Sequence, residues 1–257
     1  MSKLLVVDIG NTTTRVGHWE EGRVAQVRAA RTGEVRDVAD VDALAEPLLE
    51  ECEAGGAASE MALCAVVPQA EGLWLDWAAR TGVEVLVITG RTDTPLENRY
   101  GRPDQLGADR LAAAVGAARR LGAPVIVVSL GTATVVDVVS GDGRFLGGAI
   151  AAGLETGLIA LAERTAALPR VTLATPERVL GADTEQCLLS GAVYGTAALV
   201  EGLVARFHET LGGSAPVALT GGHAGLISPH LSLEHEVLPE LVLEGAGAIW
   251  EYNRGLE

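Results

Sequence analysis

The sequence predicts an α/β protein built from two similar halves, and two observations support this prediction. Apolar runs of strand length, each followed by a turn signal, alternate along the chain with segments of helical period. Such alternation is typical of an α/β fold. The predicted strands begin at residues 4, 61, 83, 125 and 217, and the predicted helices cover 41–54, 69–80, 107–122, 154–168 and 183–212.

The second observation is a long internal repeat. Aligning Gly10 with Gly131 gives an offset of 131 − 10 = 121 residues, at which the first strand and the turn after it recur. Each copy is expected to form three strands joined by turns and followed by helices. A repeat of this length, present twice, predicts two domains and not a solenoid of short units. We place them at residues 1–121 and 122–257, because a helix ends in Gly near residue 122 and a Pro precedes the next strand.

Composition narrows the classes of function. The chain of 257 residues has a formal net charge of −15, which argues against nucleic acid as a main partner, because such proteins need clustered Lys and Arg. Its three cysteines are far apart and lack metal spacing, so we expect reduced thiols in a cytoplasmic protein. We expect no signal peptide and no membrane span, since no apolar run reaches the roughly 18 residues that a span needs.

Three glycine-rich turns are candidates for binding phosphate or nucleotide. The turns after the strands that begin at residues 4 and 125 combine Gly with Thr, so their N–H groups and hydroxyls can approach a phosphate. Asp8 ends the first of these strands, where it can hold Mg²⁺ through water. Either motif alone is better explained as an ordinary turn, but two copies at one offset favour phosphate binding. A third turn, 220-TGGHAGLI-227, can lie close to a flat ring or a ribose.

The segment 98-NRYGRPDQLGADRL-111 carries a second group of candidates. It is loop-like up to Gly107, after which a helix begins with Asp109 and Arg110 in its first turn. The helix dipole favours a carboxylate there, which by itself would explain Asp109. Tyr100, the glycine-rich approach and the adjacent Arg110 favour a substrate site, with a general base and a group that binds a carboxylate.

Six short motifs occur in a fixed order: D-I-G-N-T at 8–12, G-A-D-R at 107–110, G-T-A-T at 131–134, G-G-A-I at 147–150, S-G-A-V-Y-G at 190–195 and T-G-G at 220–222. In this order they resemble the type III pantothenate kinases, over essentially the whole chain. That family is similar to the actin, Hsp70 and sugar-kinase superfamily, which has two ribonuclease-H-like domains around an ATP cleft. The resemblance implies ATP-dependent phosphorylation of pantothenate to 4'-phosphopantothenate, the first step of coenzyme A biosynthesis, by a homodimer.

The resemblance also implies a role for each matching residue. Asp109 is the base that takes the proton of the substrate hydroxyl, and Asp8 is the carboxylate on the Mg²⁺ side. The ATP-binding positions are Asp8, Ile9, Gly10, Asn11, Thr12, Thr13, Thr14, Arg15, Gly131, Thr132, Gly221 and Gly222. The pantothenate-binding positions are Tyr100, Gly107, Ala108, Asp109, Arg110 and, near the dimer interface, Thr184. Transfer is expected to be in line, with positioning and charge neutralisation supplying most of the rate.

Ser129 departs from the family pattern. The family has an aspartate at this position, associated with a bound monovalent cation, typically K⁺. A serine hydroxyl supplies no negative charge, so we expect the cation to bind weakly, if it binds at all. Val135 replaces a position that is commonly Thr, and Asp137 is expected to lie too far along its strand to substitute.

Two other functions fit parts of the sequence. A catalytically weak relative that binds ATP and acts as a regulatory or accessory protein has no reason to keep both Asp8 and Asp109. A generic sugar or acetate kinase leaves G-A-D-R at 107–110 unexplained. The pantothenate kinase hypothesis is therefore the stronger one. Within it, we expect the helix at 183–212 to lie at or near the dimer interface, because its small residues permit close helix packing.

Overall fold

The computed structural model describes residues 4–50 and 60–256, and the chain divides into two compact units. Unit 1 comprises Met1–Arg120, Gly143–Phe145 and Glu240–Glu257, and unit 2 comprises Leu121–Asp142 and Leu146–Pro239. The boundary expected between residues 121 and 122 lies one residue from the first break between the units. The division differs from the expected one in assigning Glu240–Glu257 to unit 1. Cys52 and the end of the helix predicted at 41–54 lie outside the described residues.

Unit 1 is built on a five-stranded sheet. Its strands are β1 (Leu4–Ile9), β2 (Thr13–Glu20), β3 (Arg23–Arg31), β4 (Glu60–Ala65) and β5 (Glu84–Ile88), in the order β3-β2-β1-β4-β5. β2 is antiparallel to both β1 and β3, and β4 and β5 continue the sheet in parallel with β1. Each parallel step needs a helical connection, which α1 (Val38–Glu50) and α2 (Pro68–Thr81) provide. The short 3-10 helix η1 (Thr32–Glu34) precedes α1.

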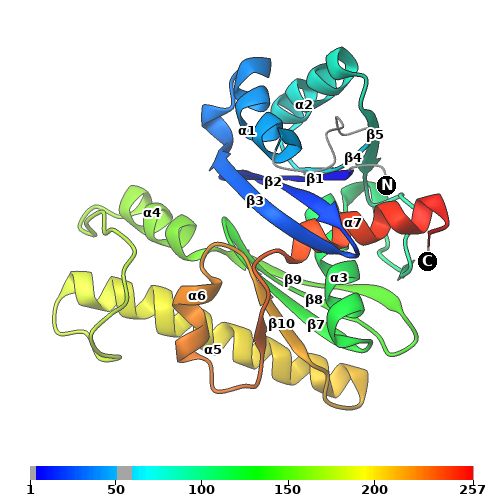
Figure 1. Cartoon of the computed structure of the whole chain (residues 1–257). Helices are drawn as coiled ribbons and strands as arrows, with labels where there is room; N and C mark the ends of the chain where they lie inside the picture. Colours follow the sequence, from blue (N-terminus) through cyan, green and yellow to red (C-terminus); the bar gives the residue numbers. More distant parts are fainter. Residues whose placement is uncertain (1–3, 51–59, 257) are drawn as a thin grey trace. The chain divides into compact units, whose positions relative to one another are not determined.

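Helices cover both faces of this sheet (Figure 1). On one face, α1 and α2 pack against alternate residues of β1, with the rings of Trp74 and Trp77 buried among them. On the other face lies α7 (Leu241–Arg254), where Leu243 approaches Gly17 of β2. Because side chains alternate along a strand, Asp8 projects to the α7 face and not into the core with α1 and α2.

The C-terminal helix α7 was not predicted from the sequence. This helix packs against α3 (Ala108–Leu121) through glycines on both helices. A Cβ at Gly116 would meet the Leu241 carbonyl, and one at Gly245 would overlap the backbone of Ala112. Glycine therefore allows the two helices to approach closely, and this contact explains why the C-terminal helix belongs to unit 1.

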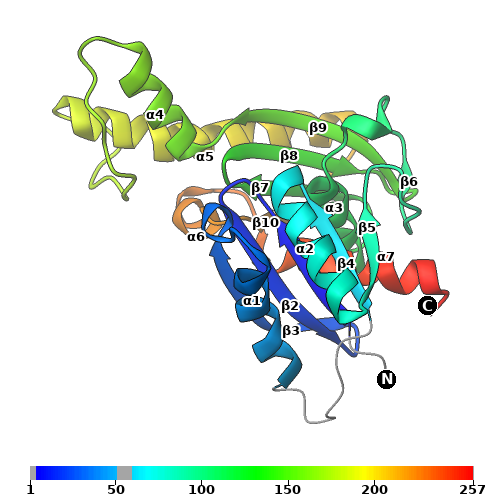
Figure 2. The same ribbon diagram turned by 90° about the horizontal axis from the view of Figure 1, so that it is seen from above.

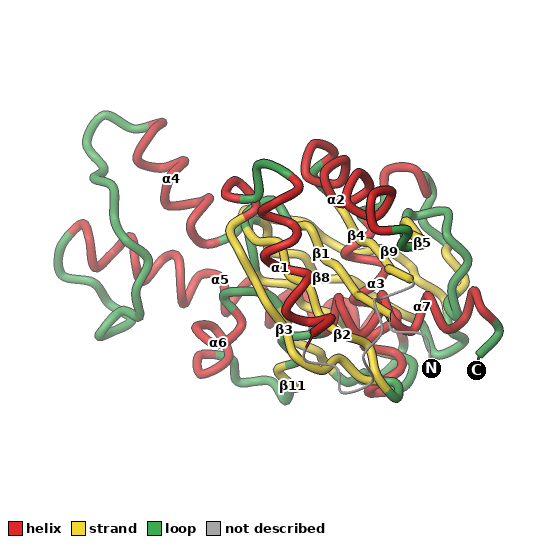
Figure 3. Tube along the Cα trace, turned by 45° about the horizontal axis from the view of Figure 1, so that its top comes forward, coloured by secondary structure: helices red, strands yellow, loops and turns green. Residues whose placement is uncertain are grey.

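Unit 2 is built on a second sheet. Its strands are β7 (Val125–Leu130), β8 (Ala133–Val139), β9 (Arg144–Ala152), β10 (Val217–Thr220) and β11 (Glu236–Val237), in the order β11-β10-β7-β8-β9. The long helix α5 (Thr184–Leu211) runs along this sheet in Figure 2, with Val193, Val200 and Val204 in the shared core. α4 (Leu154–Arg164), α6 (Ala224–Ile227) and the 3-10 helix η3 (Ser228–His230) complete the unit. Residues 165–183, between α4 and α5, form a long loop in Figure 3.

The first two residues of β9, Arg144 and Phe145, belong to unit 1. There they pair in parallel with β6 (Glu97–Asn98), which precedes the 3-10 helix η2 (Pro103–Gln105) and α3. The segment predicted to bind substrate thus starts beside β9 and ends at α3.

The two halves share their strand order, but their first turns differ in length. Ile9 lies opposite Thr14, whereas Leu130 lies opposite Thr134, so the first turn is one residue longer. The offset of 121 residues therefore becomes 134 − 14 = 120 after the turn. The counterpart of Thr134 in the sheet is Thr14, and not Thr13 as the sequence alignment implied.

Candidate active site

The first predicted phosphate turn joins β1 to β2 and is held in place by Thr32. The Gly10 N–H donates to the Thr13 carbonyl at 3.0 Å, and the Thr32 hydroxyl donates to the Gly10 carbonyl at 2.7 Å. The Thr32 N–H donates to the Thr12 carbonyl at 2.9 Å. These bonds restrain the turn, while the side chains of Asn11, Thr12 and Thr13 remain exposed to a ligand. Sequence reasoning missed Thr32.

Two predicted ATP-binding residues near this turn have buried side chains. Ile9 belongs to the core under α1 and α2, so only its backbone can meet a ligand. The Thr14 hydroxyl is buried and lies 3.0 Å from the hydroxyl of Thr32. Both side chains therefore support the turn from within unit 1.

The carboxylates of Asp8 and Asp109 come from two different elements and interact electrostatically. Asp8 is near the end of β1, and Asp109 is in the first turn of α3. The pKa of Asp8 is raised from 3.8 to about 7, first because burial penalises the charged form and second because Asp109 is negative. The positive charge of Arg15 opposes this rise. The two carboxylates therefore lie close enough for the charge of one to affect the protonation of the other.

Cys64 of β4 lies beside this carboxylate pair. It is directly opposite Asp8 in the sheet, and its thiol is 4.0 Å from the Ala108 carbonyl at the start of α3. Burial, followed by the charges of Asp8 and Asp109, raises the pKa of the Cys64 thiol well above its ordinary value. The Cys64 thiol is therefore neutral and lies next to Asp8 in the sheet. Cys64 was not predicted from the sequence to belong to the site.

Arg15 lies opposite Asp8 on β2 and is held by Glu240, the residue before α7. Its Nη2 donates to the two carboxylate oxygens of Glu240 at 2.6 and 2.5 Å. This ion pair joins residues 225 positions apart and ties the C-terminal segment to the strand after the first turn. No local pattern marks Glu240, and the sequence analysis missed it.

The start of α3 accommodates Asp109 in two ways. The Asp109 Oδ1 accepts the N–H of Arg110 at 2.9 Å, which satisfies one of the N–H groups that a helix start leaves without partners. A Cβ at Gly107 would overlap the Asp109 carboxylate, so glycine leaves the space that this side chain occupies. The position of Asp109 at the helix start thus has a structural reason, and its role as a general base in a substrate site stays a prediction.

Tyr100 and Arg110, both predicted to bind the substrate, are in contact. The Arg110 guanidinium is largely buried and lies 5.3 Å from the centre of the Tyr100 ring. It also lies 5.9 Å from the ring of Phe145, and the two rings are 6.2 Å apart. Phe145 is a further residue that sequence reasoning did not assign.

In unit 2, the second and third predicted turns meet around Leu130. The Gly131 N–H donates to the Ala133 carbonyl at 3.0 Å, and the His223 N–H donates to the Leu130 carbonyl at 3.0 Å. Gly221 has a φ of 94° and lies against the Leu130 backbone, where no side chain would fit. Thr132 and Gly222 are exposed beside these contacts. The structure therefore brings Gly131, Thr132, Gly221 and Gly222 together.

Comparison with known proteins identifies the family. The family model for type III pantothenate kinase matches residues 4–206. The chain is 38% identical to a type III pantothenate kinase of Roseiflexus sp. (strain RS-1), with 98% of this chain and 99% of the relative covered. It is 36% identical to one of Moorella thermoacetica, with 97% and 99% covered. The chain belongs to the type III pantothenate kinase family.

Solved structures agree on the fold. A Baf family protein from Campylobacter jejuni, described as a transcriptional activator, gives a TM-score of 0.62 at 17% identity and covers 98% of this chain and 100% of its own. A ROK family glucokinase from Streptomyces griseus, with glucose and AMPPNP, gives 0.55 at 16% identity, with 96% and 98% covered. At these identities the likeness shows the fold alone. The predicted two-domain α/β fold of the actin-like ATPases and sugar kinases is confirmed.

In this type III pantothenate kinase, Ser129 occupies the place in unit 2 that Asp8 occupies in unit 1. Asp8 lies opposite Arg15 across its strand pair, whereas Ser129 lies opposite Val135. The second copy thus lacks both charges of the first. Asp137 is buried and lies opposite Val127, which places it on the same face of the sheet as Ser129, two positions along the strand.

His223 is an ionisable residue within the third turn. Its Nε2 lies 3.9 Å from the Glu155 carboxylate, and its buried Nδ1 has no hydrogen-bond partner among the residues that the structure describes. Gly153 and Thr156, on either side of Glu155, both donate to the Thr132 carbonyl, at 3.1 and 2.7 Å. These bonds fix the second turn against the start of α4.

Much of helix α5 is exposed to solvent. Thr184 is exposed and begins this helix after the N-cap Asp183, whose side chain accepts the Gln186 N–H at 2.8 Å. A stretch of 18 residues in α5 has a mean hydropathy of 1.6, and only 22% of it is buried. By length and composition α5 is apolar enough to cross a membrane, contrary to the expectation from the sequence, although core helices of soluble proteins meet the same criterion.

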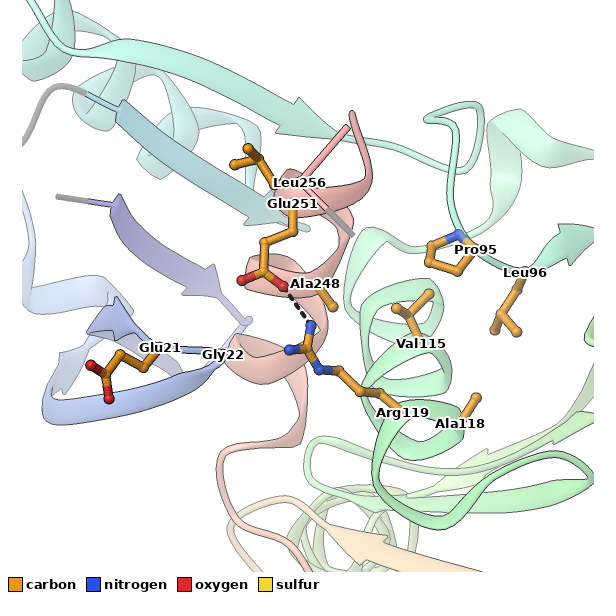
Figure 4. A pocket seen from close by; sticks show the side chains of 10 residues that line it. All are labelled: Glu21, Gly22, Pro95, Leu96, Val115, Ala118, Arg119, Ala248, Glu251 and Leu256. Atoms are coloured by element: carbon orange, nitrogen blue, oxygen red, sulfur yellow. Dashed lines mark hydrogen bonds and ion pairs between the residues drawn. The ribbon is translucent and has the colours of Figure 1, made fainter. Parts of the chain in front are cut away.

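A hollow of about 660 Å³ in unit 1 contains none of the predicted site residues. In Figure 4, Arg119 near the end of α3 points towards Glu251 of α7. The Arg119 Nη1 donates to the Glu251 Oε2 at 2.6 Å. The Arg119 guanidinium also lies 5.3 Å from the Trp19 ring, whose Nε1 donates to Glu251 at 2.8 Å. Arg119 and Glu251 thus bind each other, and none of the residues that line the hollow belongs to the site around Asp8 and Asp109.

Proposed function

We propose that this chain transfers the γ-phosphoryl group of ATP to the hydroxyl of pantothenate, giving 4'-phosphopantothenate for coenzyme A biosynthesis. The interaction between Asp8 and Asp109 is the observation that carries this proposal. A kinase uses one carboxylate near the metal-bound phosphates and another to take the proton of the acceptor hydroxyl, whereas a protein that only binds ATP has no use for the second. Membership of the family supports pantothenate as the acceptor.

In this mechanism Asp109 is the general base. Its carboxylate, held at the start of α3 by the Arg110 N–H, accepts the proton as the pantothenate hydroxyl attacks the γ-phosphorus. Arg110 and Tyr100, together with the backbone of Gly107 and Ala108, bind the rest of pantothenate, and the guanidinium matches its carboxylate. Thr184 adds a contact near the dimer interface.

Mg²⁺ and the ATP phosphates belong beside Asp8. Among the described residues, no group of three or more His, Cys, Asp or Glu side chains is placed to hold a metal ion. That pattern suits Mg²⁺, which uses one or two carboxylates, waters and substrate phosphates. The raised pKa of Asp8 is also consistent with a Mg²⁺ site, because the positive charge of Arg15 does not offset the effects of burial and of Asp109. Bound Mg²⁺ would neutralise phosphate charge beside Asp8, and the exposed side chains of Asn11, Thr12 and Thr13 in the first turn would contact ATP.

The potassium dependence of this enzyme is expected to be weak. Ser129→Asp restores a carboxylate opposite Val135, so turnover or ATP affinity should rise and become dependent on K⁺. Ser129→Asn, which adds bulk without charge, is the control and should give no gain. Steady-state rates with and without K⁺ measure both. A wild type that K⁺ already activates strongly, with no gain in Ser129→Asp, would show that a cation finds its ligands elsewhere.

We propose that the enzyme is a homodimer joined through the exposed apolar side chains of unit 2. These are Leu146 and Ile150 on β9, Ile159 and Leu161 on α4, and Leu199 on α5. Ile150 is 61% exposed on the same face of β9 as Leu146, and exposed apolar side chains that lie together mark an interaction surface. Ile150→Asp should therefore give a monomer in analytical ultracentrifugation at micromolar concentration. Leu256→Asp, at an equally exposed leucine of unit 1, should remain dimeric, and a monomeric wild type with full activity would contradict the proposal.

The test of the function is a comparison of phosphoryl acceptors. With ATP and Mg²⁺, ADP should form with pantothenate and not with glucose or acetate. Turnover of glucose or acetate would favour a generic kinase, whereas ATP binding without turnover of any acceptor would favour an accessory protein. We further propose a cytoplasmic location, to which the free thiols of Cys64 and Cys187 are suited.

A further inference from the structure

Phe145 contacts Arg110 and Tyr100, two of the residues that are proposed to bind pantothenate. We propose that Phe145 is a positioning residue for substrate choice, which holds the Arg110 guanidinium and the segment leading to Tyr100, so that acceptors carrying a carboxylate are preferred. This inference rests on the proposed function, because it concerns the pantothenate site.

The ring of Phe145 packs against the guanidinium of Arg110 and restrains it. Phe145 is 0% exposed and Arg110 is 9% exposed, and the guanidinium lies within 6 Å of the centres of both the Phe145 and Tyr100 rings. A cation held against two rings loses its rotamer freedom before the substrate arrives, which lowers the entropy cost of binding.

The backbone of Phe145 is hydrogen-bonded to the segment before Tyr100. Its carbonyl accepts the Arg99 N–H at 3.0 Å, and Phe145 lies opposite Asn98 in the β6–β9 pair. Asn98 in turn accepts the Tyr100 N–H on its Oδ1 at 2.9 Å and donates from Nδ2 to the Gly90 carbonyl at 2.8 Å. The position of Tyr100 thus depends on the strand that carries Phe145.

A purely structural role for Phe145 predicts a different result. A buried phenylalanine that only fills the core affects the free energy of unfolding and changes the kinetics with every acceptor alike. A positioning role affects the KM of acceptors that have a carboxylate and leaves other acceptors unchanged. The two roles therefore separate when pantothenate is compared with its neutral alcohol analogue, in which a CH₂OH group replaces the carboxylate.

The experiment uses Phe145→Leu, with Phe207→Leu as the matched control. Phe207 is the other phenylalanine of the chain and packs against the core of unit 2. For Phe145→Leu we expect KM for pantothenate to rise about tenfold, with kcat within about threefold and KM for ATP unchanged. KM for the neutral analogue should stay at the wild-type value. Phe207→Leu should change none of these constants, and Phe145→Tyr, which keeps the ring, should retain the wild-type preference.

A further variant separates this inference from the proposed function. Arg110→Gln should raise KM for pantothenate and not for the neutral analogue. If Arg110→Gln has no effect, the carboxylate assignment in the proposed function is wrong. If it has the expected effect but Phe145→Leu changes both acceptors equally or neither, the role given to Phe145 is wrong. Should Phe145→Leu not fold, Phe145→Met keeps the side-chain volume without the ring, and the same two outcomes decide.

Discussion

Asp109→Asn lowers kcat by about 100-fold or more and leaves the protein folded. The amide cannot take the proton of the pantothenate hydroxyl, and loss of a positioned general base typically costs 10²–10⁴ in rate. It retains an oxygen that can accept the Arg110 N–H, so the start of α3 is preserved. The measurement is steady-state kcat together with circular dichroism and thermal unfolding.

The control for this prediction is Asp76→Asn. Asp76 is exposed on α2, so the same change of charge there should leave kcat near the wild-type value. Near-normal turnover in a folded Asp109→Asn variant would remove Asp109 from the chemical step.

Asp8→Asn has two effects of opposite sign. It removes the carboxylate on the Mg²⁺ side, so kcat/KM for MgATP should fall by about 100-fold or more. In the metal-free protein it should raise stability at pH 8, because the charged carboxylate destabilises the fold there. The folded pKa of about 7 lies above the ordinary 3.8, so folded protein holds this proton more tightly. Stability from Asp8 is therefore full below pH 3.8 and is lost as the pH rises to about 7.

Thermal unfolding across pH measures this second effect. The pKa difference sets an upper limit of about 4 kcal/mol, and partial exposure of Asp8 reduces the expected gain to about 1–2 kcal/mol, or several degrees in Tm. Near pH 4 the difference between Asp8→Asn and wild type should largely disappear. Asp76→Asn should match the wild type at both pH values. A lower Tm for Asp8→Asn at pH 8 would show that the Asp8 carboxylate is stabilised in the metal-free protein, against the assigned pKa.

Local patterns were sufficient to predict most of the fold. The strands at 4, 61, 83, 125 and 217 and five of the helices lie where apolar period and turn residues placed them. The helix α7 was missed because Gly245 and Gly247 interrupt its pattern, and glycine disfavours helix interiors. These glycines are explained only by the folded protein, where a side chain at Gly245 would clash with Ala112 and one at Gly247 would clash with Trp19.

The site likewise has residues that local motifs predict and residues that only distant contacts reveal. Asp8 and Asp109 lie in motifs that could be recognised along the chain, and their interaction is consistent with the assignment. Thr32, Glu240 and Phe145 support that site through contacts with residues distant in sequence, so no spacing marks them. The length of the first turn was also inaccessible, because it depends on which residues pair across the strands.

The identity of the product decides whether this chain phosphorylates pantothenate. Purified protein with ATP, Mg²⁺ and pantothenate is followed by ³¹P NMR and mass spectrometry, beside Asp109→Asn. The account predicts a single phosphomonoester on the 4'-hydroxyl of pantothenate, one ADP for each product molecule, and almost no product from Asp109→Asn. Hydrolysis of ATP without phosphorylated pantothenate, or an equal product rate from Asp109→Asn, would contradict it.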